Sequence, residues 1–224
     1  IGSVNPVGRE AQILLPSGFS VSGPTTMQLN STVTDTVWRV ITSAVSGNYA
    51  FEILVRGREL NTGALLADTL QYNVQVFDRA DLALSGKILD PPGARDFTIS
   101  TNQSFTISYK VTNQGEVGTS GLSQIIVSLP VGQRLTFEPT NPARDRDTLY
   151  VATDDSVLAT VYSLGQESLT AQNISANLVQ AALDTNSNQA AQIIDPNEII
   201  GVIIVREAEL RFDITDVDTV VSQN

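Results

Sequence analysis

The chain has 224 residues, of which 42% are hydrophobic and 17% charged, so it has the length of one or two domains that can bury cores of their own. Its formal net charge is −11, which excludes the basic footprint of a nucleic-acid-binding protein and disfavours adsorption to anionic membranes. Cysteine and histidine are both absent, which excludes disulfides, thiolate or imidazole metal sites, and Ser-His-Asp triads.

Most periodic segments alternate apolar and polar residues with a period of two, which is typical of half-buried β-strands. In chain order, their apolar positions are Tyr49, Phe51, Ile53 and Val55; Leu70, Tyr72, Val74 and Val76; Phe105, Ile107, Tyr109 and Val111; and Ile125, Val127 and Leu129. The run from Ile199 to Val205 is almost wholly apolar and predicts a central strand. Short strands separated by regular turns predict an all-β fold of the sandwich type.

The segment 168–184 departs from this pattern. It places Leu169, Ile174, Leu178 and Ala181 near helical spacing and is rich in the helix formers Ala, Gln and Leu. The sequence therefore predicts one short helix near 168–184, followed by an exposed loop that begins at Asp184.

Two sequence patterns occur twice in the same order, which indicates an internal repeat. Leu15-Pro-Ser-Gly and Leu129-Pro-Val-Gly each follow an apolar stretch and lie 114 positions apart. Asp78-Arg-Ala-Asp-Leu82 and Arg206-Glu-Ala-Glu-Leu210 each follow a Val-rich strand and lie 128 positions apart. The second copy would then hold about 14 extra residues. The alternative is that such patterns recur by chance in β-proteins.

The repeat predicts the domain boundaries. Residues 1–78 would form a β-sandwich domain whose first strands are missing or supplied by another segment. Residues 79–206 would form a complete immunoglobulin-like β-sandwich domain. Residues 207–224 would be the start of a further repeat or a donor strand. The chain has no initial Met and no signal peptide, so we expect it to be a fragment of a longer polypeptide.

The two repeat boundaries carry similar strand-forming sequences. Ala80, Leu82 and Leu84 should begin a strand of the second domain. The apolar residues Leu210, Phe212 and Ile214 alternate with polar residues in the same way. They have no core of their own within residues 207–224, so we expect them to fray or to pair with a sheet edge, locally or on another copy of the chain.

One stretch resembles a known group of domains. The sequence Phe105-Thr-Ile-Ser-Tyr-Lys-Val-Thr-Asn-Gln-Gly115 is similar to a strand followed by a V-x-N-x-G turn, and Pro130-Val-Gly132 continues the pattern. This order, with Asp81-Leu-Ala-Leu84 as a first strand, resembles the CARDB and DUF11 groups of immunoglobulin-fold repeat domains. The resemblance implies tandem sandwiches of bacterial or archaeal surface and secreted proteins, with adhesion, spacing or scaffolding roles and no defined active site.

Carboxylates are the main catalytic groups that this composition leaves, and a glycosidase would need two of them facing each other. Asp154, Asp155, Asp195 and Glu198 are the candidates. Asp154 and Asp155 lie in a turn sequence, and Asp195 precedes a proline, which are ordinary positions for Asp. The sequence therefore favours a chain that is not an enzyme.

Calcium is the metal that best suits a chain with only oxygen ligands. Asp213, Asp216 and Asp218 cluster near the end, and Asp145 and Asp147 cluster beside two arginines. No calcium-loop motif surrounds either cluster, so solvated loop charge is the simpler interpretation. No transition metal and no other cofactor is expected.

Several other residues allow a functional and a structural interpretation. Trp38 could stack on a sugar, but its alternation with Val40 favours a core face. Asn30, Asn102 and Asn173 begin N-x-[ST] sequons. Three such sequons are also expected by chance in a chain rich in Ser, Thr and Asn. Lys87 and Lys110 are the lysines from which an intramolecular isopeptide could form, and Lys110 should face outward.

Together these features predict a non-catalytic structural or adhesive module of a secreted or cell-surface repeat protein, acting as a spacer or assembly unit. Its expected partners are proteins, including copies of itself through strand pairing. Neither nucleic acid binding nor membrane insertion is expected, because the basic patch and the 18-residue apolar run that they require are absent. The alternative is a carbohydrate-binding accessory module of a secreted enzyme, for which 13 aromatic residues are a thin supply.

Overall fold

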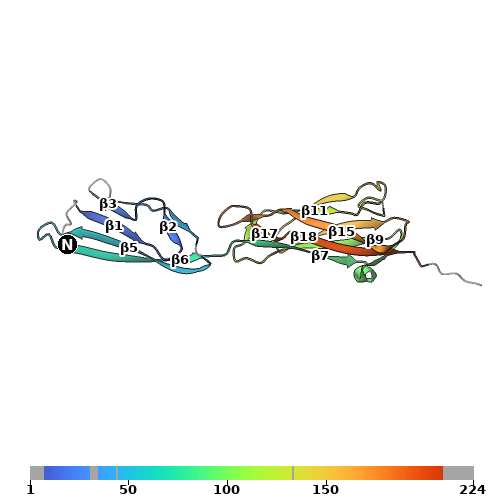
Figure 1. Ribbon diagram of the computed structural model, residues 1–224, viewed down its shortest axis with the longest axis horizontal. Coiled ribbons are helices and arrows are strands. Elements are labelled where there is room, and N and C mark those ends of the chain that lie inside the picture. The colour runs from blue at the N-terminus through green and yellow to red at the C-terminus, as the bar shows by residue number, and fades with distance from the viewer. Residues whose placement is uncertain (1–7, 31–34, 44, 133, 209–224) are drawn as a thin grey trace, which may run out of the picture. The chain divides into compact units, whose positions relative to one another are not determined.

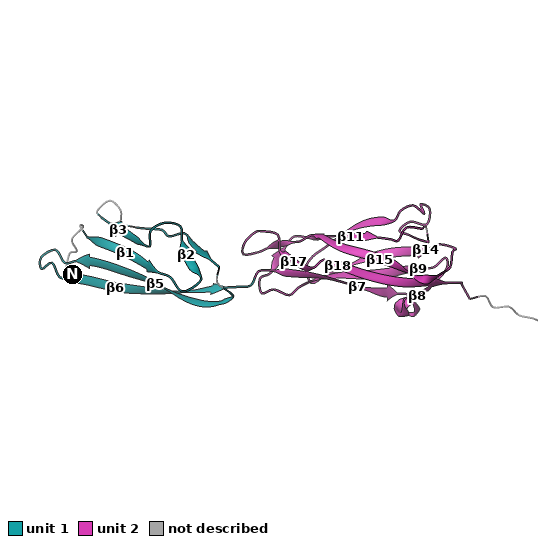
Figure 2. Cartoon of the chain, in the orientation of Figure 1, with its two compact units in different colours: residues 1–78 teal, residues 79–224 magenta. Residues whose placement is uncertain are grey.

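The computed structural model describes residues 8–30, 35–43, 45–132 and 134–208 of the chain. The chain divides into two compact units, residues 1–78 (unit 1) and residues 79–224 (unit 2), which are coloured separately in Figure 2. The described elements are strands apart from one short 3-10 helix, so the predicted all-β class is confirmed. Among the described residues, no helix has the length and apolar character needed to cross a bilayer.

Unit 1 is built on a four-stranded antiparallel sheet with the order β3-β1-β5-β6 and a two-stranded ribbon of β2 and β4 (Figure 1). Its strands are β1 (Arg9–Leu14), β2 (Phe19–Val21), β3 (Thr26–Leu29), β4 (Val40–Thr42), β5 (Gly47–Arg58) and β6 (Leu65–Val76). β5 and β6 pair along their full length, so alternate residues of both strands lie on one face of the sheet.

Unit 2 contains two five-stranded sheets with the orders β13-β11-β15-β18-β8 and β12-β14-β9-β7-β17, and a short β10-β16 pair. The elements of its first half are β7 (Asp81–Asp90), the 3-10 helix η1 (Pro92–Asp96), β8 (Thr98–Ser100), β9 (Ser104–Asn113), β10 (Thr119–Ser120), β11 (Ser123–Ser128) and β12 (Leu135–Thr136). Those of its second half are β13 (Arg146–Val151), β14 (Ser156–Ser163), β15 (Ser168–Gln180), β16 (Leu183–Asp184), β17 (Gln192–Asp195) and β18 (Asn197–Val205).

The two sheets of unit 2 enclose one apolar core. The inward residues predicted from alternation in β9 and β11 are buried, with Phe105, Ile107 and Tyr109 at 1% exposure or less. Ala80, Leu82 and Leu84 are also buried, and β7 begins at Asp81 as the sequence predicts. Burial of this many apolar side chains between two sheets is the main favourable term for folding. The arrangement is therefore β-sandwich-like.

The helix predicted near 168–184 is wrong, because residues 168–180 form the long strand β15. In this strand Gln172, Ile174, Ala176 and Leu178 are buried, while the residues between them are more exposed. The buried set has a period of two, and strands β11 and β18 pair with β15 on its two sides. Long-range pairing thus overrides the helix propensity of Ala, Gln and Leu.

The main sheet of unit 1 and one sheet of unit 2 have the same pattern of strand pairing. β1 pairs with β3 and β5, and β5 pairs with β6, all antiparallel. In unit 2, β11 pairs with β13 and β15, and β15 pairs with β18, again all antiparallel. β1 corresponds to β11 through the two Leu-Pro-x-Gly sequences that follow these strands, and β6 corresponds to β18 through the 128-residue offset.

Candidate interaction surface

The main sheet of unit 1 carries apolar side chains on one face, which we call the open face. It is formed by Phe51 and Ile53 of β5 with Leu70, Tyr72 and Val74 of β6. Phe51 pairs with Tyr72, and Ile53 pairs with Leu70, so their side chains point to the same side of the sheet. The alternate residues of β6, such as Thr69 and Gln71, are polar, as expected for a strand with one buried face.

This face is nevertheless largely uncovered along β6. Leu70, Tyr72 and Val74 are 46%, 54% and 41% exposed. Tyr72 and Val74 border a groove of about 540 Å³, which lies between the main sheet and the β2-β4 ribbon. The groove is lined by Ile13, Phe19, Val40, Thr42, Phe51, Ile53, Tyr72, Val74, Gln75 and Val76. Contiguous exposed apolar surface of this kind makes the open face the candidate interaction surface of the described residues.

The β2-β4 ribbon packs on β5 through Phe19. Phe19 of β2 meets Tyr49 and Phe51 of β5 edge to face, with ring centroids 4.9 and 4.8 Å apart. Phe51 is consequently buried. A second hollow of about 430 Å³ continues past Val55 toward Leu66, so the cover is incomplete in that direction too.

Unit 2 shows how the corresponding face is covered. Its strand β18 presents Ile200, Val202 and Ile204, which are at most 3% exposed. Strand β7 of the other sheet lies close to β18. At Gly86 of β7 an added β-carbon would lie 3.0 Å from Glu198 Cγ in β18. The face that is open in unit 1 is therefore closed by a second layer in unit 2.

The chain is held tightly where it enters unit 2. The Ala80 N–H donates to Asp184 Oδ2 (3.0 Å), and the Ala80 carbonyl accepts from the Gln192 N–H (2.9 Å). Asp184 Oδ1 accepts from two further backbone N–H groups in the turn that follows (2.9 and 2.8 Å). These hydrogen bonds, first of all the one from Ala80, lower the pKa of the Asp184 carboxyl. An added β-carbon at Gly115 would lie 2.0 Å from the Arg79 carbonyl oxygen, so only glycine fits beside the incoming chain.

The four candidate catalytic carboxylates come from two places in unit 2, the turn before β14 and the connection from β17 to β18. Asp154 and Asp155 are exposed turn residues, and Asp154 has a left-handed φ of 64°. Asp195 ends β17, and Glu198 lies in β18. Burial, followed by the charge of Asp195, raises the pKa of Glu198.

Glu198 lies beside Tyr109. Ring carbons of Tyr109 and the Glu198 Cγ both lie 3.0 Å from the position of a β-carbon built on Gly86. Burial and then the Glu198 charge raise the pKa of the Tyr109 hydroxyl, which is buried and has no hydrogen-bond partner. The raised pKa keeps this phenol in its protonated form at neutral pH.

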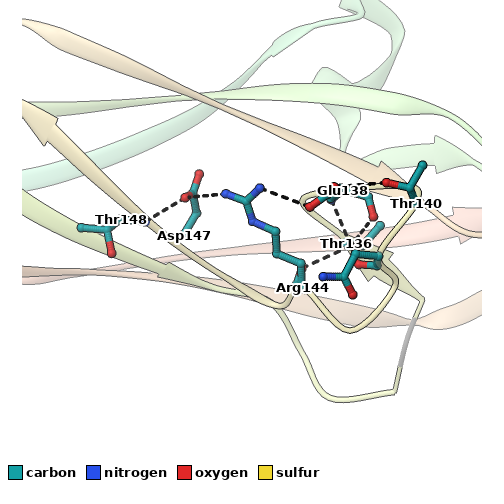
Figure 3. A network of polar contacts seen from close by, with 7 residues as sticks. Thr136, Glu138, Thr140, Arg144, Asp147 and Thr148 are labelled. Carbon is teal, nitrogen blue, oxygen red and sulfur yellow. Dashed lines mark hydrogen bonds and ion pairs between the residues drawn. The ribbon is translucent and has the colours of Figure 1, made fainter.

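The candidate calcium ligands are engaged otherwise or lie outside the described residues. Arg144 bonds Asp147 Oδ1 (3.2 Å) and Glu138 Oε2 (3.5 Å), as Figure 3 shows. Nearby, the buried Thr136 hydroxyl lies 2.9 Å from the Asn141 carbonyl and accepts the Glu138 N–H (3.1 Å). This network fixes the β12–β13 loop, and Asp145 beside it is exposed.

Within 8–30, 35–43, 45–132 and 134–208, no group of three or more Asp and Glu side chains is placed to hold a metal ion. Asp213, Asp216 and Asp218 lie outside these residues, as do Leu210, Phe212 and Ile214 of the predicted donor strand.

The remaining candidates occupy exposed or partly exposed positions. Trp38 is half-buried before β4 and not on a strand, and its Nε1–H donates to the Pro24 carbonyl (3.2 Å), so its predicted core-face position is wrong. The need of the indole N–H for a polar partner accounts for this position. The sequon residues Asn30, Asn102 and Asn173 are exposed. Lys87 and Lys110 are exposed too, as predicted for Lys110.

Sequence reasoning missed two features of the site. The loop beginning at Asp184 was expected to be exposed, but Asp184 itself is 2% exposed. Its spacing to Asn186 and Ser187 is a signal for an Asx-type turn, although nothing local reveals the bond to Ala80. The exposure of β6 was also missed, because alternation shows which face is apolar and not whether a second layer covers it.

No protein-family model matches the chain, and no curated protein matches it. The resemblance to the CARDB and DUF11 groups therefore stays a prediction. Function has to be inferred from the contacts and chemistry of the chain itself.

Proposed function

We propose that the chain is a non-catalytic structural module of a secreted or cell-surface repeat protein, in which it acts as a spacer and assembly unit. The shared sheet order of the two units supports an internal repeat. The repeated sequences also fall at equivalent places, since Leu-Pro-x-Gly follows both β1 and β11. The Arg-Ala and Glu-Ala boundary sequences likewise follow β6 and β18. Tandem units that repeat in this way form extended molecules, whose function lies in length and in contacts between units.

The way in which unit 2 holds its two chain ends carries this proposal. Its incoming end is fixed by Ala80, which bonds Asp184 and Gln192. Its outgoing end is fixed by the Val205 carbonyl, which accepts from the Thr101 N–H (2.8 Å). Asn113, near the incoming end, and Ser104, near the outgoing end, lie at opposite ends of β9. A pull on the chain therefore runs along the strands of unit 2, as suits a spacer.

Single-molecule stretching of the 224-residue chain by its two ends tests this function. We expect unit 2 to unfold in one step that releases on the order of 400 Å of chain, after unit 1 has opened at lower force. The variant Asp184→Ala should lower the unfolding force of unit 2, and Asp155→Ala, in an exposed turn, should leave it unchanged. Gradual extension of unit 2 without a distinct step would contradict a spacer role.

Carbohydrate binding is the second candidate, and the exposure of Tyr72 on the open face favours it. Aromatic rings in a groove can stack on sugars, but the groove offers few polar side chains beyond Thr42 and Gln75 to bond sugar hydroxyls. A glycan panel probed with the chain and with Tyr72→Ala decides the matter. Specific binding that Tyr72→Ala abolishes would replace the structural function by this one.

A further inference from the structure

Strand β6 of unit 1 lacks the cover that its counterpart has in unit 2. Under the 128-residue offset, Val74 corresponds to Val202, and Leu70 corresponds to Glu198. In unit 2, β7 of the opposite sheet lies close to β18, and a β-carbon added at Gly86 of β7 would lie 3.0 Å from Glu198 Cγ of β18. Unit 1 has no strand in this place among its described residues. The vacancy over β6 is therefore that of a strand like β7.

Residues 206–214 repeat the apolar pattern of the sequence at the start of β7, 128 positions further along the chain. Ala208, Leu210 and Phe212 stand where β7 has Ala80, Leu82 and Leu84, which are all buried in unit 2. Charged residues separate them, so the segment has one apolar and one charged face.

Two positions that differ between the repeats fit a docking of residues 206–214 on the open face. In unit 2, Gly86 leaves room for Glu198 and for the ring of Tyr109. Position 214 holds Ile in place of that glycine, and unit 1 holds Leu70 in place of Glu198. An Ile and a Leu side chain would thus meet where unit 2 has a glycine and a carboxylate. This complementarity is apolar and suits the exposed surface of β6.

The segment leaves unit 2 far from the point where the chain enters. The Glu207 N–H lies 3.3 Å from Thr101 Oγ1, whereas Ala80 contacts Asp184. These contacts lie at the two ends of β9, ten residues apart, which in a strand spans about 33 Å. A return along unit 2 would use up residues 207–214 before they reached residue 78. The segment can therefore reach the open face of another molecule more readily than that of its own.

We propose that residues 207–214 of one copy dock across β6 on the open face of unit 1 in a second copy, in the place that β7 holds over β18. Leu210 and Phe212 enter the groove, and Ile214 packs on the exposed Leu70 of the same strand β6. Because donor and acceptor are different surfaces, the contact is head to tail and propagates into linear chains of molecules. The proposal rests on the assembly role proposed above and names the contact that performs it.

Light scattering over a concentration series tests the association with paired variants. The average mass should rise with concentration beyond that of a dimer. Phe212→Ser and Val74→Ser should each weaken the association at least about tenfold. Their neighbours on the opposite strand faces give the controls, and Asp213→Ser and Asn73→Ser should leave it unchanged. A chain that stays monomeric at every concentration, or controls that weaken association as much, would overturn the proposal.

Disulfide trapping tests which residue of the docked segment faces which residue of β6. Because the chain has no native cysteine, any disulfide must join the introduced residues. A chain carrying Leu70→Cys is mixed with one carrying Ile214→Cys under mild oxidation. The proposal predicts mixed dimers, because residues that face each other in this way can approach disulfide distance. Replacing Ile214→Cys by Asp213→Cys should abolish the mixed product. Preferential Leu70→Cys homodimers would instead show that two open faces pack together and would overturn strand docking.

These outcomes are separate from the test of the spacer function. A monomeric chain whose unit 2 unfolds in one forced step would refute docking and keep the spacer role. A chain that associates through residues 207–214 while unit 2 extends gradually would support docking and refute the spacer role.

Discussion

Val74 in β6 and Val202 in β18 are the same residue type at corresponding positions of two sheets with the same strand order. Val74 is 41% exposed, whereas Val202 is 0% exposed. Val74 lies on the apolar face of an alternating strand, and Val202 lies in a strand that is apolar on both faces, so both positions are suited to burial. The difference is that β7 lies over β18 and no described strand lies over β6. Alternation thus defines an apolar face, and only a second layer turns that face into a core.

The largest expected effect concerns the close passage of the incoming chain in unit 2. Gly115→Ala would place a β-carbon 2.0 Å from the Arg79 carbonyl oxygen, a backbone atom that cannot move aside without shifting β7. We expect it to lower the free energy of unfolding of unit 2 by about 3 kcal/mol and to leave unit 1 unchanged. Thermal unfolding followed by calorimetry measures this.

Gly118→Ala is the matched control in the same loop, because its β-carbon would lie 3.8 Å from the nearest heavy atom, Thr185 Oγ1. If Gly115→Ala cost no more than this control, the packing at the start of β7 would be looser than described.

A matched pair of truncations probes the two layers themselves. Val202→Ala removes two buried methyl groups and leaves a cavity, so it should destabilise unit 2 by about 2 kcal/mol. Val74→Ala removes the same groups from an exposed site and should cost unit 1 less than about 0.5 kcal/mol in dilute solution. Chemical denaturation of the two variants gives both values. Equal costs would mean that the face of β6 is covered after all.

The anchor of unit 2 should show a characteristic dependence on pH. Because hydrogen bonds lower the pKa of Asp184 in the folded state, its charged form stabilises unit 2 above the unfolded pKa. This contribution is lost as the pH falls through the lower folded pKa. Asp184→Asn should therefore destabilise unit 2 at pH 7, and the deficit should shrink as the pH falls below about 4.

Melting temperatures measured from pH 7 to pH 2.5 follow this deficit, with Asp155→Asn as the exposed control. A deficit that stayed constant or grew toward low pH would rule out the charged carboxylate as the anchor.

The smallest effect is expected for the buried hydroxyl of Tyr109. This group has no hydrogen-bond partner and lies near Glu198, so its removal leaves no polar group unpaired. Tyr109→Phe should change the stability of unit 2 by less than about 0.5 kcal/mol or increase it. A loss of more than about 1 kcal/mol would show that the hydroxyl is bonded in solution. Denaturant unfolding at pH 7 distinguishes these results.

The sequence correctly predicted features that depend on the residues of a single strand, such as its buried face and its first residues. Alternation identified the buried faces of β9 and β11, and Ala80 and Leu82 were assigned to the start of a strand. Sequence patterns gave the wrong result where contacts with distant segments determine the secondary structure or the burial of a residue. β15 looked partly helical because its pairing with β11 and β18 cannot be read from its own residues. Asp184 looked exposed because its partner Ala80 lies 104 positions away.

The candidate surface was foreseen only in outline. The vacancy in residues 1–78 and the donor segment followed from the repeat, but the uncovered strand could not be identified without the fold. That β6 and not β5 is exposed depends on the contact of Phe19 with Phe51, which joins two strands across a long loop. Side-chain contacts of this kind leave no periodic trace in a sequence.

Hydrogen exchange of the backbone amides in β6 and β18, compared over a range of protein concentrations, tests the central claim most directly. Amides of an uncovered strand open with a smaller free energy than those of a core strand. Amides of β18 should exchange slowly at every protein concentration. Amides of β6 should exchange fast at low protein concentration and more slowly as the chains associate. Equal protection of the two strands at the lowest concentration would contradict this claim.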